Sequence, residues 1–190
     1  ANGPLFKNGK TESNTSYIVS VRRSYLQFLF ELIGLPIRPD YWDYQYKITH
    51  RLNALSTLSL VGVGSVDDFA VDATGDIELN ELSTLEQAPF IEQQSNTVGL
   101  SWRKRFESGQ GFVTTTVSNN LLKNDFSRFS DNRNETGRYF YSNATESETK
   151  LRSSVSYFWN DWQFVSGVNV QQSTYRNSTE DTVIGFAYAT

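Results

Sequence analysis

Apolar and polar residues alternate with a period of two along most of the chain, the pattern of a β-strand with one apolar face. In residues 41–53, every even position from Trp42 to Leu52 except His50 is aromatic or aliphatic, whereas the odd positions from Asp43 to Arg51 are polar. The same alternation recurs in residues 15–23, 57–67, 96–106, 111–119, 148–159, 162–172 and 182–190. The pattern predicts an all-β, antiparallel protein of about eight strands, many near the 9–11 residues of a tilted membrane-spanning strand.

The connections between these segments alternate in length. Short turns are expected at residues 54–56, 107–110 and 160–161, and long polar loops at residues 24–40, 70–95, 122–146 and 173–181. Outer-membrane barrels have short periplasmic turns and longer extracellular loops, so the alternation favours a transmembrane β-barrel over a soluble sandwich.

The loop at residues 24–40 breaks the strand pattern. Leu26, Leu29, Phe30 and Ile33 have helical spacing, and Gly34 and Pro36 follow them. This spacing predicts a short amphipathic helix that ends before the next strand.

Aromatic residues gather near the ends of the predicted strands. Tyr and Trp side chains favour the level of the lipid headgroups, so these rings are candidates for a lipid-facing girdle. The six girdle candidates are Trp42, Tyr44, Trp102, Tyr157, Trp159 and Trp162.

The opposite face of the strands is polar and carries several cations. A wide barrel has a hydrated interior, so such residues are expected to line the lumen or to contact a plug inside it. The lumen-facing candidates are Arg22, Asp43, Gln45, Lys47, Arg51, Arg103, Arg105 and Arg152.

Composition narrows the range of functions. The chain has 190 residues with no Cys and a single His, which excludes disulfide scaffolds, thiolate zinc sites and cysteine nucleophiles. The formal net charge of -4 gives no basic footprint for nucleic acid. Asp67 and Asp68 are adjacent and point to opposite faces of a strand, so they do not form the carboxylate pair of a glycosidase. We expect neither an enzyme nor a resident cofactor, and no metal site.

A resemblance to a known family adds to this interpretation. Three segments carry it: Gly3-Pro4-Leu5-Phe6-Lys7-Asn8-Gly9-Lys10, Ser20-Val21-Arg22-Arg23-Ser24-Tyr25-Leu26, and Tyr41-Trp42-Asp43-Tyr44-Gln45-Tyr46-Lys47. They resemble the barrel region of TonB-dependent outer-membrane receptors of the Bacteroidetes type, in which an Arg-Arg-Ser/Thr-Tyr strand end leads through a loop into a Tyr-Asp-x-x-x-Lys strand. The strand Leu58-Ser59-Leu60 running into Asp67-Asp68 continues the likeness, which weakens after residue 68.

The resemblance implies a barrel of about 22 strands, plugged by an N-terminal domain, in the bacterial outer membrane. Such a receptor imports a nutrient, for example a glycan or siderophore, with energy passed from the inner-membrane protein TonB. Residues 1–190 would then form a partial barrel domain, and the plug and remaining strands would belong to the rest of the receptor. The implied partners are the lipid bilayer, the remainder of the receptor, TonB through the missing N-terminal region, and a surface lipoprotein.

Two further expectations concern binding. Aromatic rings and guanidinium groups in the long loop at residues 122–146 could stack on sugars or pair with carboxylates of a ligand. These loop candidates are Phe126, Phe129, Tyr139, Phe140 and Tyr141, with Arg128, Arg133 and Arg138. The alternative to the transporter is a soluble β-sandwich or a lipocalin-like ligand-binding module, which the small size suits.

Overall fold

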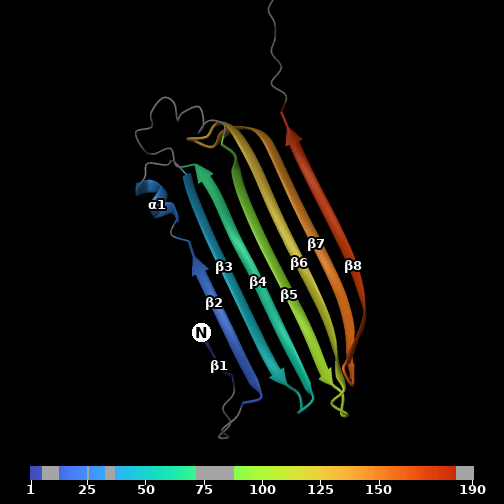
Figure 1. The fold of residues 1–190 in the computed structure, drawn as a ribbon. Helices are drawn as coiled ribbons and strands as arrows, with labels where there is room; N and C mark the ends of the chain where they lie inside the picture. Colours follow the sequence, from blue (N-terminus) through green and yellow to red (C-terminus); the bar gives the residue numbers. More distant parts are fainter. Residues whose placement is uncertain (6–12, 25, 33–36, 72–87, 183–190) are drawn as a thin grey trace, which may run out of the picture.

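A single antiparallel sheet of eight strands makes up most of the protein (Figure 1). The computed structural model describes residues 1–5, 13–24, 26–32, 37–71 and 88–182. The strands run in sequence order, and each is hydrogen-bonded to the next. Their bounds are β1 Asn2–Pro4, β2 Thr15–Arg23, β3 Ile37–Arg51, β4 Ser56–Val71, β5 Phe90–Arg105, β6 Gly111–Asp131, β7 Thr136–Trp159 and β8 Trp162–Asp181. The fold is therefore all-β and antiparallel, as the alternation predicts.

Helix α1, Leu26–Leu32, lies between β2 and β3 and confirms the short helix predicted in that loop. It contacts β3 at one end of the sheet, and Phe28, Leu29 and Leu32 are exposed. Strand β3 begins at Ile37, so it takes the last residues of the predicted loop at 24–40. None of the described helical residues forms a helix long and apolar enough to cross a membrane.

Short turns join the strands at the opposite end of the sheet, which we call the turn end; the end with α1 is the helix end. The β7–β8 turn has the two residues predicted for it, Asn160 and Asp161, and Asn160 takes a positive φ of 48°. Asn tolerates this left-handed conformation, which two-residue hairpins require. In the β5–β6 turn the same conformation falls on Gly109, with φ 73°.

The outer strands are longer than predicted. Strand β6 continues to Asp131, β7 begins at Thr136, and β8 continues to Asp181. The predicted long loops at residues 122–146 and 173–181 are therefore wrong: apart from the short β6–β7 turn at residues 132–135, these residues belong to strands. The predicted strand at residues 182–190 lies outside the described residues, except for Thr182.

A tight turn at the helix end joins β6 to β7. The Asp131 carboxylate accepts hydrogen bonds from the backbone N–H groups of Arg133 and Asn134, at 2.9 and 3.3 Å, and from the Asn134 side-chain amide at 2.8 Å. The Asn134 side chain contributes most, and together these donors lower the pKa of Asp131 from its ordinary value. Below this turn the β6–β7 register shifts between Arg128 and Phe129, an irregularity of the kind that bends a strand.

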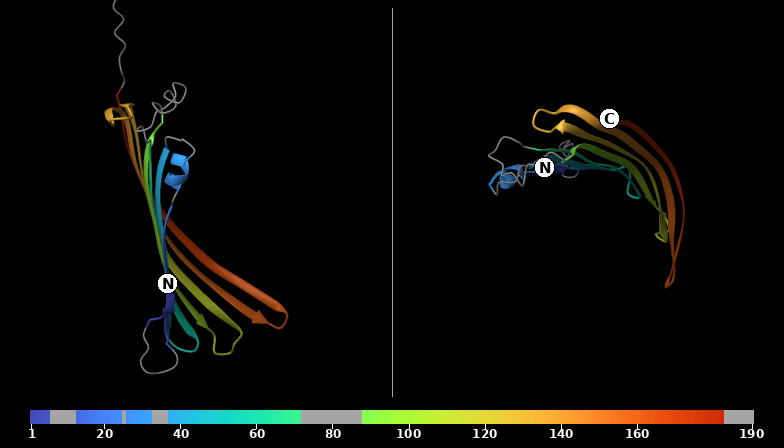
Figure 2. Two further views of the ribbon diagram at one scale, coloured as in Figure 1. Left: turned by 90° about the vertical axis from the view of Figure 1, so that its left-hand side faces the viewer. Right: turned by 90° about the horizontal axis from the view of Figure 1, so that it is seen from above.

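The sheet is curved into an open trough (Figure 2). Strands β1 and β8 are the two edges, and among the described residues they do not pair with each other. Every residue of β8 is exposed, because this strand has a neighbour on one side only and no layer against either face. The sheet is thus not a closed eight-stranded ring.

Candidate functional site: the two faces of the sheet

Cross-strand register decides which side chains share a face, because directly opposite residues point to the same side of a sheet. Arg22 is opposite Asp43, and Arg152 is opposite Thr116. Thr57 lies between Arg51 on one neighbouring strand and Arg103 on the other, so these three residues share a face. Gln45, Lys47 and Arg105 have the same phase on their strands as Asp43 and Arg103. All eight residues predicted to face a lumen therefore lie on one face of the sheet, which we call the polar face.

The six aromatic girdle candidates lie on the other face. Trp42 pairs with Val66, Leu58 pairs with Trp102, and Trp159 pairs with Trp162. Tyr44 and Tyr157 have the phase of Trp42 and Trp159 on their own strands. These are the chain's four tryptophans and two of its ten tyrosines, and we call this side the apolar face.

The polar face is the concave one. A hollow of about 770 Å³ is lined mainly by polar-face residues of β6, β7 and β8, including Ser118, Lys150 and Asn169. A second, of about 690 Å³, is lined by residues of β3 to β6 that include Arg51 and Arg103. Side chains converge on the concave side of a curved sheet and spread apart on the convex side. The apolar face is accordingly the outside of the trough seen in Figure 2.

The apolar face is uncovered in the described protein. The exposed fraction reaches 67% for Trp162, 57% for Val168 and Val170, and 45% for Leu100. Other exposed apolar residues of this face are Val19, Val21, Trp42, Val66, Trp102, Val117, Leu151, Val155, Tyr157, Trp159 and Phe164. Exposed aromatic and aliphatic side chains that follow one another across neighbouring strands mark contact with a partner or a membrane.

This apolar surface forms a belt that crosses the strands obliquely. Ile48 of β3 and Val170 of β8 belong to one register row, which runs through Leu60, Leu100, Val117 and Leu151. On β3 the belt extends from this row toward the helix end, as far as Trp42; on β8 it extends toward the turn end, as far as Trp162. Strands in a barrel are tilted relative to the barrel axis. A belt perpendicular to that axis therefore crosses a different register row on each successive strand, as this one does.

Polar groups at the edge of the belt have hydrogen-bond partners. At the turn end, Trp102 Nε1 donates to Ser56 Oγ at 2.8 Å, and Tyr157 Oη donates to Gln110 Oε1 at 3.1 Å. The hydroxyls of Thr115 and Ser153 bond to each other at 2.9 Å. His50, predicted to sit outward near a short turn, shares a 2.7 Å hydrogen bond with the Thr15 hydroxyl. An apolar solvent requires such internal pairing, because an unpaired polar group there is costly.

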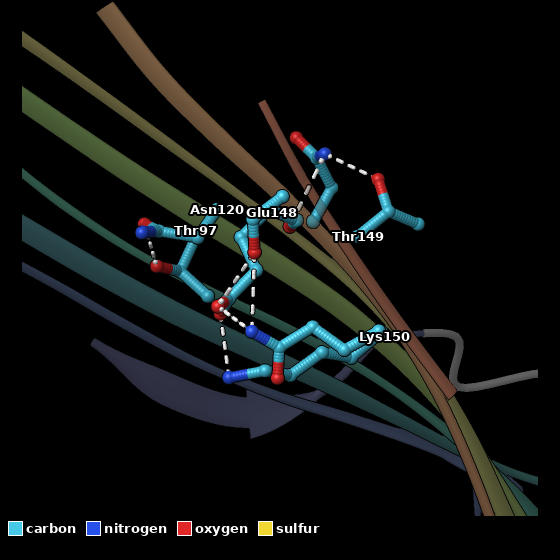
Figure 3. Close-up of polar contacts among 8 residues, drawn as sticks. Thr97, Asn120, Glu148, Thr149 and Lys150 are labelled. Atoms are coloured by element: carbon cyan, nitrogen blue, oxygen red, sulfur yellow. Dashed lines mark hydrogen bonds and ion pairs between the residues drawn. The ribbon is translucent and has the colours of Figure 1, made fainter. Parts of the chain in front are cut away.

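The polar face carries a network of hydroxyl, amide and charged groups (Figure 3). Glu148 forms an ion pair of 2.5 Å with Lys150 and accepts hydrogen bonds from Gln171 and from Ser173, the latter at 3.4 Å. Beside it, Thr97 Oγ1 donates to Asn120 Oδ1 at 2.8 Å. Nearer the helix end, Arg22 forms a 2.9 Å ion pair with Asp43. Groups such as these can hold water, ions or another polar surface.

The predicted loop contacts for a ligand lie on strands, not in a loop. Phe126 is on β6 and packs edge to face with Phe140 of β7, their ring centroids 5.7 Å apart. Phe129, also on β6, packs in the same way against Phe90 of β5 at 5.2 Å.

Arg138, Tyr139 and Tyr141 are on β7, where the Arg138 guanidinium lies 4.4 Å from the Tyr141 ring centroid. Register puts Phe126 on the polar face and Tyr141 on the apolar face, so the set does not form one cluster. Their contact with a ligand remains a prediction.

Sequence analysis missed Glu148, Lys150 and Asn120 as members of the polar face. The period-two alternation could have identified Glu148 and Lys150, because they precede Arg152 by four and two residues and therefore point to the same face. It also missed two tyrosine–glycine pairs on the apolar face. Gly62 and Gly64 of β4 are buried beneath the rings of Tyr46 and Tyr44, their register partners on β3.

Comparison with known proteins identifies no relative: no family model, no curated protein and no solved structure was found to match the chain.

Proposed function

We propose that this chain forms part of the wall of a transmembrane β-barrel in the bacterial outer membrane. One observation carries the proposal: the concave face of the sheet is predominantly polar, although Val61, Val63 and Val165 are exposed on it, and the convex face carries an uncovered apolar belt. A soluble β-protein has the opposite arrangement, with apolar side chains inside the curve and polar ones outside. A membrane barrel presents its apolar band to lipid and keeps water inside.

The soluble alternatives fit this arrangement poorly. A lipocalin-like module closes its barrel around an apolar cavity, whereas here the hollows are lined by residues such as Lys150, Arg152 and Asn169. A β-sandwich would need a second sheet over the belt, and all the described strands belong to one sheet. The diagonal course of the belt also favours lipid, because a packed core has no reason to follow a plane across tilted strands.

The open edges support a larger assembly. Within the described part of the chain, strands β1 and β8 each leave one row of backbone N–H and C=O groups without a strand partner. Unpaired backbone groups of this kind do not occur against lipid, so further strands must continue the sheet at both edges. In the proposal, those strands come from the rest of the same receptor.

The transport function rests on the resemblance of residues 3–68 to TonB-dependent receptors together with the polar interior. A wide, hydrated lumen admits a solute and binds it without chemical change. The strands also continue far beyond the belt: on β8 the belt ends at Val170, and polar residues follow as far as Asp181. A nutrient importer would use this extended rim to make its first contact with the solute.

Fluorescence of the four tryptophans tests the membrane assignment, since all four lie on the apolar face. In vesicles of the full-length protein, with tryptophans outside residues 1–190 replaced by phenylalanine, phospholipids brominated near the headgroup should quench most of the emission, and aqueous iodide should quench little. Quenching by iodide with none by brominated lipid would contradict the proposal. The matched control variant is Trp162→Phe, which should remove part of the emission but leave the quenched fraction of the rest unchanged.

A further inference from the structure

Positive charge is concentrated on the polar face in the half nearest the turn end. The cations there are Lys47, Arg51, Arg103, Arg105, Lys150 and Arg152, and Glu148 is the one acidic strand residue of the described part of this area. Glu148 is already paired with Lys150. None of the three arginines Arg51, Arg103 and Arg105 forms an ion pair with a described residue.

These three arginines surround one hollow. It measures about 690 Å³ and is bounded at the turn end by Ala54 and Leu55 of the β3–β4 turn. Arg51 and Arg103 both flank Thr57 in one register row, which separates their Cα atoms by about 9.5 Å, twice the spacing between strands. Arg105 lies two residues along β5 on the same face, about 7 Å from Arg103. Three long side chains at these separations can reach a single small ligand.

The remaining lining completes a set of hydrogen-bond donors. Hydroxyl groups come from Thr57, Ser59, Ser101 and Thr114. The guanidinium of Arg103 lies over the Phe112 ring, 3.9 Å from its centroid, and this contact limits the orientations that the guanidinium can take. An arginine cannot relieve repulsion from its neighbours by losing a proton, so the cluster is stabilised by a counter-charge brought from outside.

We propose that the hollow between Arg51, Arg103 and Arg105 is a binding site for a small multivalent oxyanion that carries phosphate or carboxylate groups. Guanidinium groups bind both through paired N–H···O bonds, and the hydroxyls can donate to the remaining oxygens. The volume lies within the range of small-molecule sites, which favours a solute over a protein surface. The site depends only on the concave face and would stand even if the membrane assignment failed.

Calorimetric titration tests this site, with inorganic pyrophosphate added to the full-length protein in detergent micelles and phosphate-free buffer of low salt. We expect saturable binding that weakens as salt is raised. Arg103→Gln and Arg51→Gln should each weaken it about tenfold, the effect of one lost charge-assisted hydrogen bond. Arg176→Gln, on the opposite face of β8 toward the helix end, should leave it unchanged. Citrate should also bind if carboxylates are accepted.

Three outcomes would overturn the proposal. The first is no binding of pyrophosphate or citrate by the unaltered protein. The second is undiminished binding by the triple variant Arg51→Gln, Arg103→Gln, Arg105→Gln. Since Arg103 also packs on Phe112, each variant must keep the far-ultraviolet circular dichroism of the unaltered protein, and Arg105→Gln serves as the test if Arg103→Gln does not fold. Binding of an acidic peptide without either small anion would also contradict a solute site.

Discussion

Replacing Leu100 by arginine is expected to destabilise the protein in a bilayer, making its free energy of folding less favourable by about 2–4 kcal/mol. Leu100 lies on the convex face of β5, in the register row where the belt is continuous from β3 to β8, and its side chain is 45% exposed. In a soluble protein an exposed position of this kind would tolerate arginine with little loss. In lipid the guanidinium must leave water, so the cost is large. Equilibrium unfolding from phospholipid vesicles measures it.

Thr97 provides the matched control for this change. It lies three residues before Leu100 on the same strand, and it points to the polar face beside Asn120. Thr97→Arg introduces the same charged side chain about 10 Å along the same strand, yet it should cost less than about 1 kcal/mol because the side chain stays hydrated. Equal costs for Thr97→Arg and Leu100→Arg would contradict the assignment of the two faces.

Substitution of Gly64 by alanine is expected to destabilise the protein by about 1–3 kcal/mol. A Cβ at this position would lie 2.7 Å from the backbone carbonyl oxygen of Ser95, and it would also meet the Tyr44 ring. The ring can move, but the carbonyl belongs to the β4–β5 ladder and cannot move without loss of strand pairing. The free energy of unfolding of the full-length protein, measured with denaturant, reports the cost.

Gly62→Ala is the control for the Gly64→Ala substitution. Its added Cβ would meet the ring of Tyr46, with no backbone atom among its nearest contacts. The destabilisation caused by Gly62→Ala should therefore be much smaller when Tyr46→Ala is also present. In contrast, the destabilisation caused by Gly64→Ala should be nearly the same with and without Tyr44→Ala. If both alanines were rescued equally, backbone contact would not be the cause at Gly64.

The strands and their faces could be predicted from the sequence because period-two alternation is a local property of the chain. Strand β2 occupies the predicted residues 15–23, and the phase of Trp42, Trp102 and Trp162 places the three rings together on one face, opposite the polar candidates. The β7–β8 turn was predictable for the same reason, since Asn160 and Asp161 separate two strongly alternating segments.

The length of the outer strands could not be predicted in this way. Residues 122–146 carry aromatic side chains among polar ones on both faces, and residues 173–181 are polar on both faces apart from Tyr175, so no contrast between faces marks them as strands. They pair through backbone hydrogen bonds with neighbours distant in sequence, as in Asp125 with Asn143 and Ala144 with Asn177. Pairing between strands that are distant in sequence cannot be recognised from local alternation. For this reason the candidate ligand contacts Phe126 and Tyr141 were assigned to a loop.

The curvature of the sheet was also beyond the sequence pattern. Alternation separates a polar from an apolar face, but it does not say which of them is concave. That choice decides between a soluble core and a lipid-facing wall, and it comes from the hollows on the polar face.

Collision of nitroxide spin labels with oxygen and with a water-soluble nickel chelate tests the orientation of the two faces most directly. Residues 1–190 contain no cysteine. In the full-length protein in vesicles, with any cysteine outside these residues replaced by serine, labels can therefore be attached one at a time to single cysteines introduced at Thr97, Val98, Leu100 and Ser101 of β5. Oxygen concentrates in hydrocarbon, and the chelate stays in water. We predict high oxygen and low chelate accessibility at positions 98 and 100, with low oxygen accessibility at 97 and 101. Loss of this alternation, or its reversal, would contradict the account.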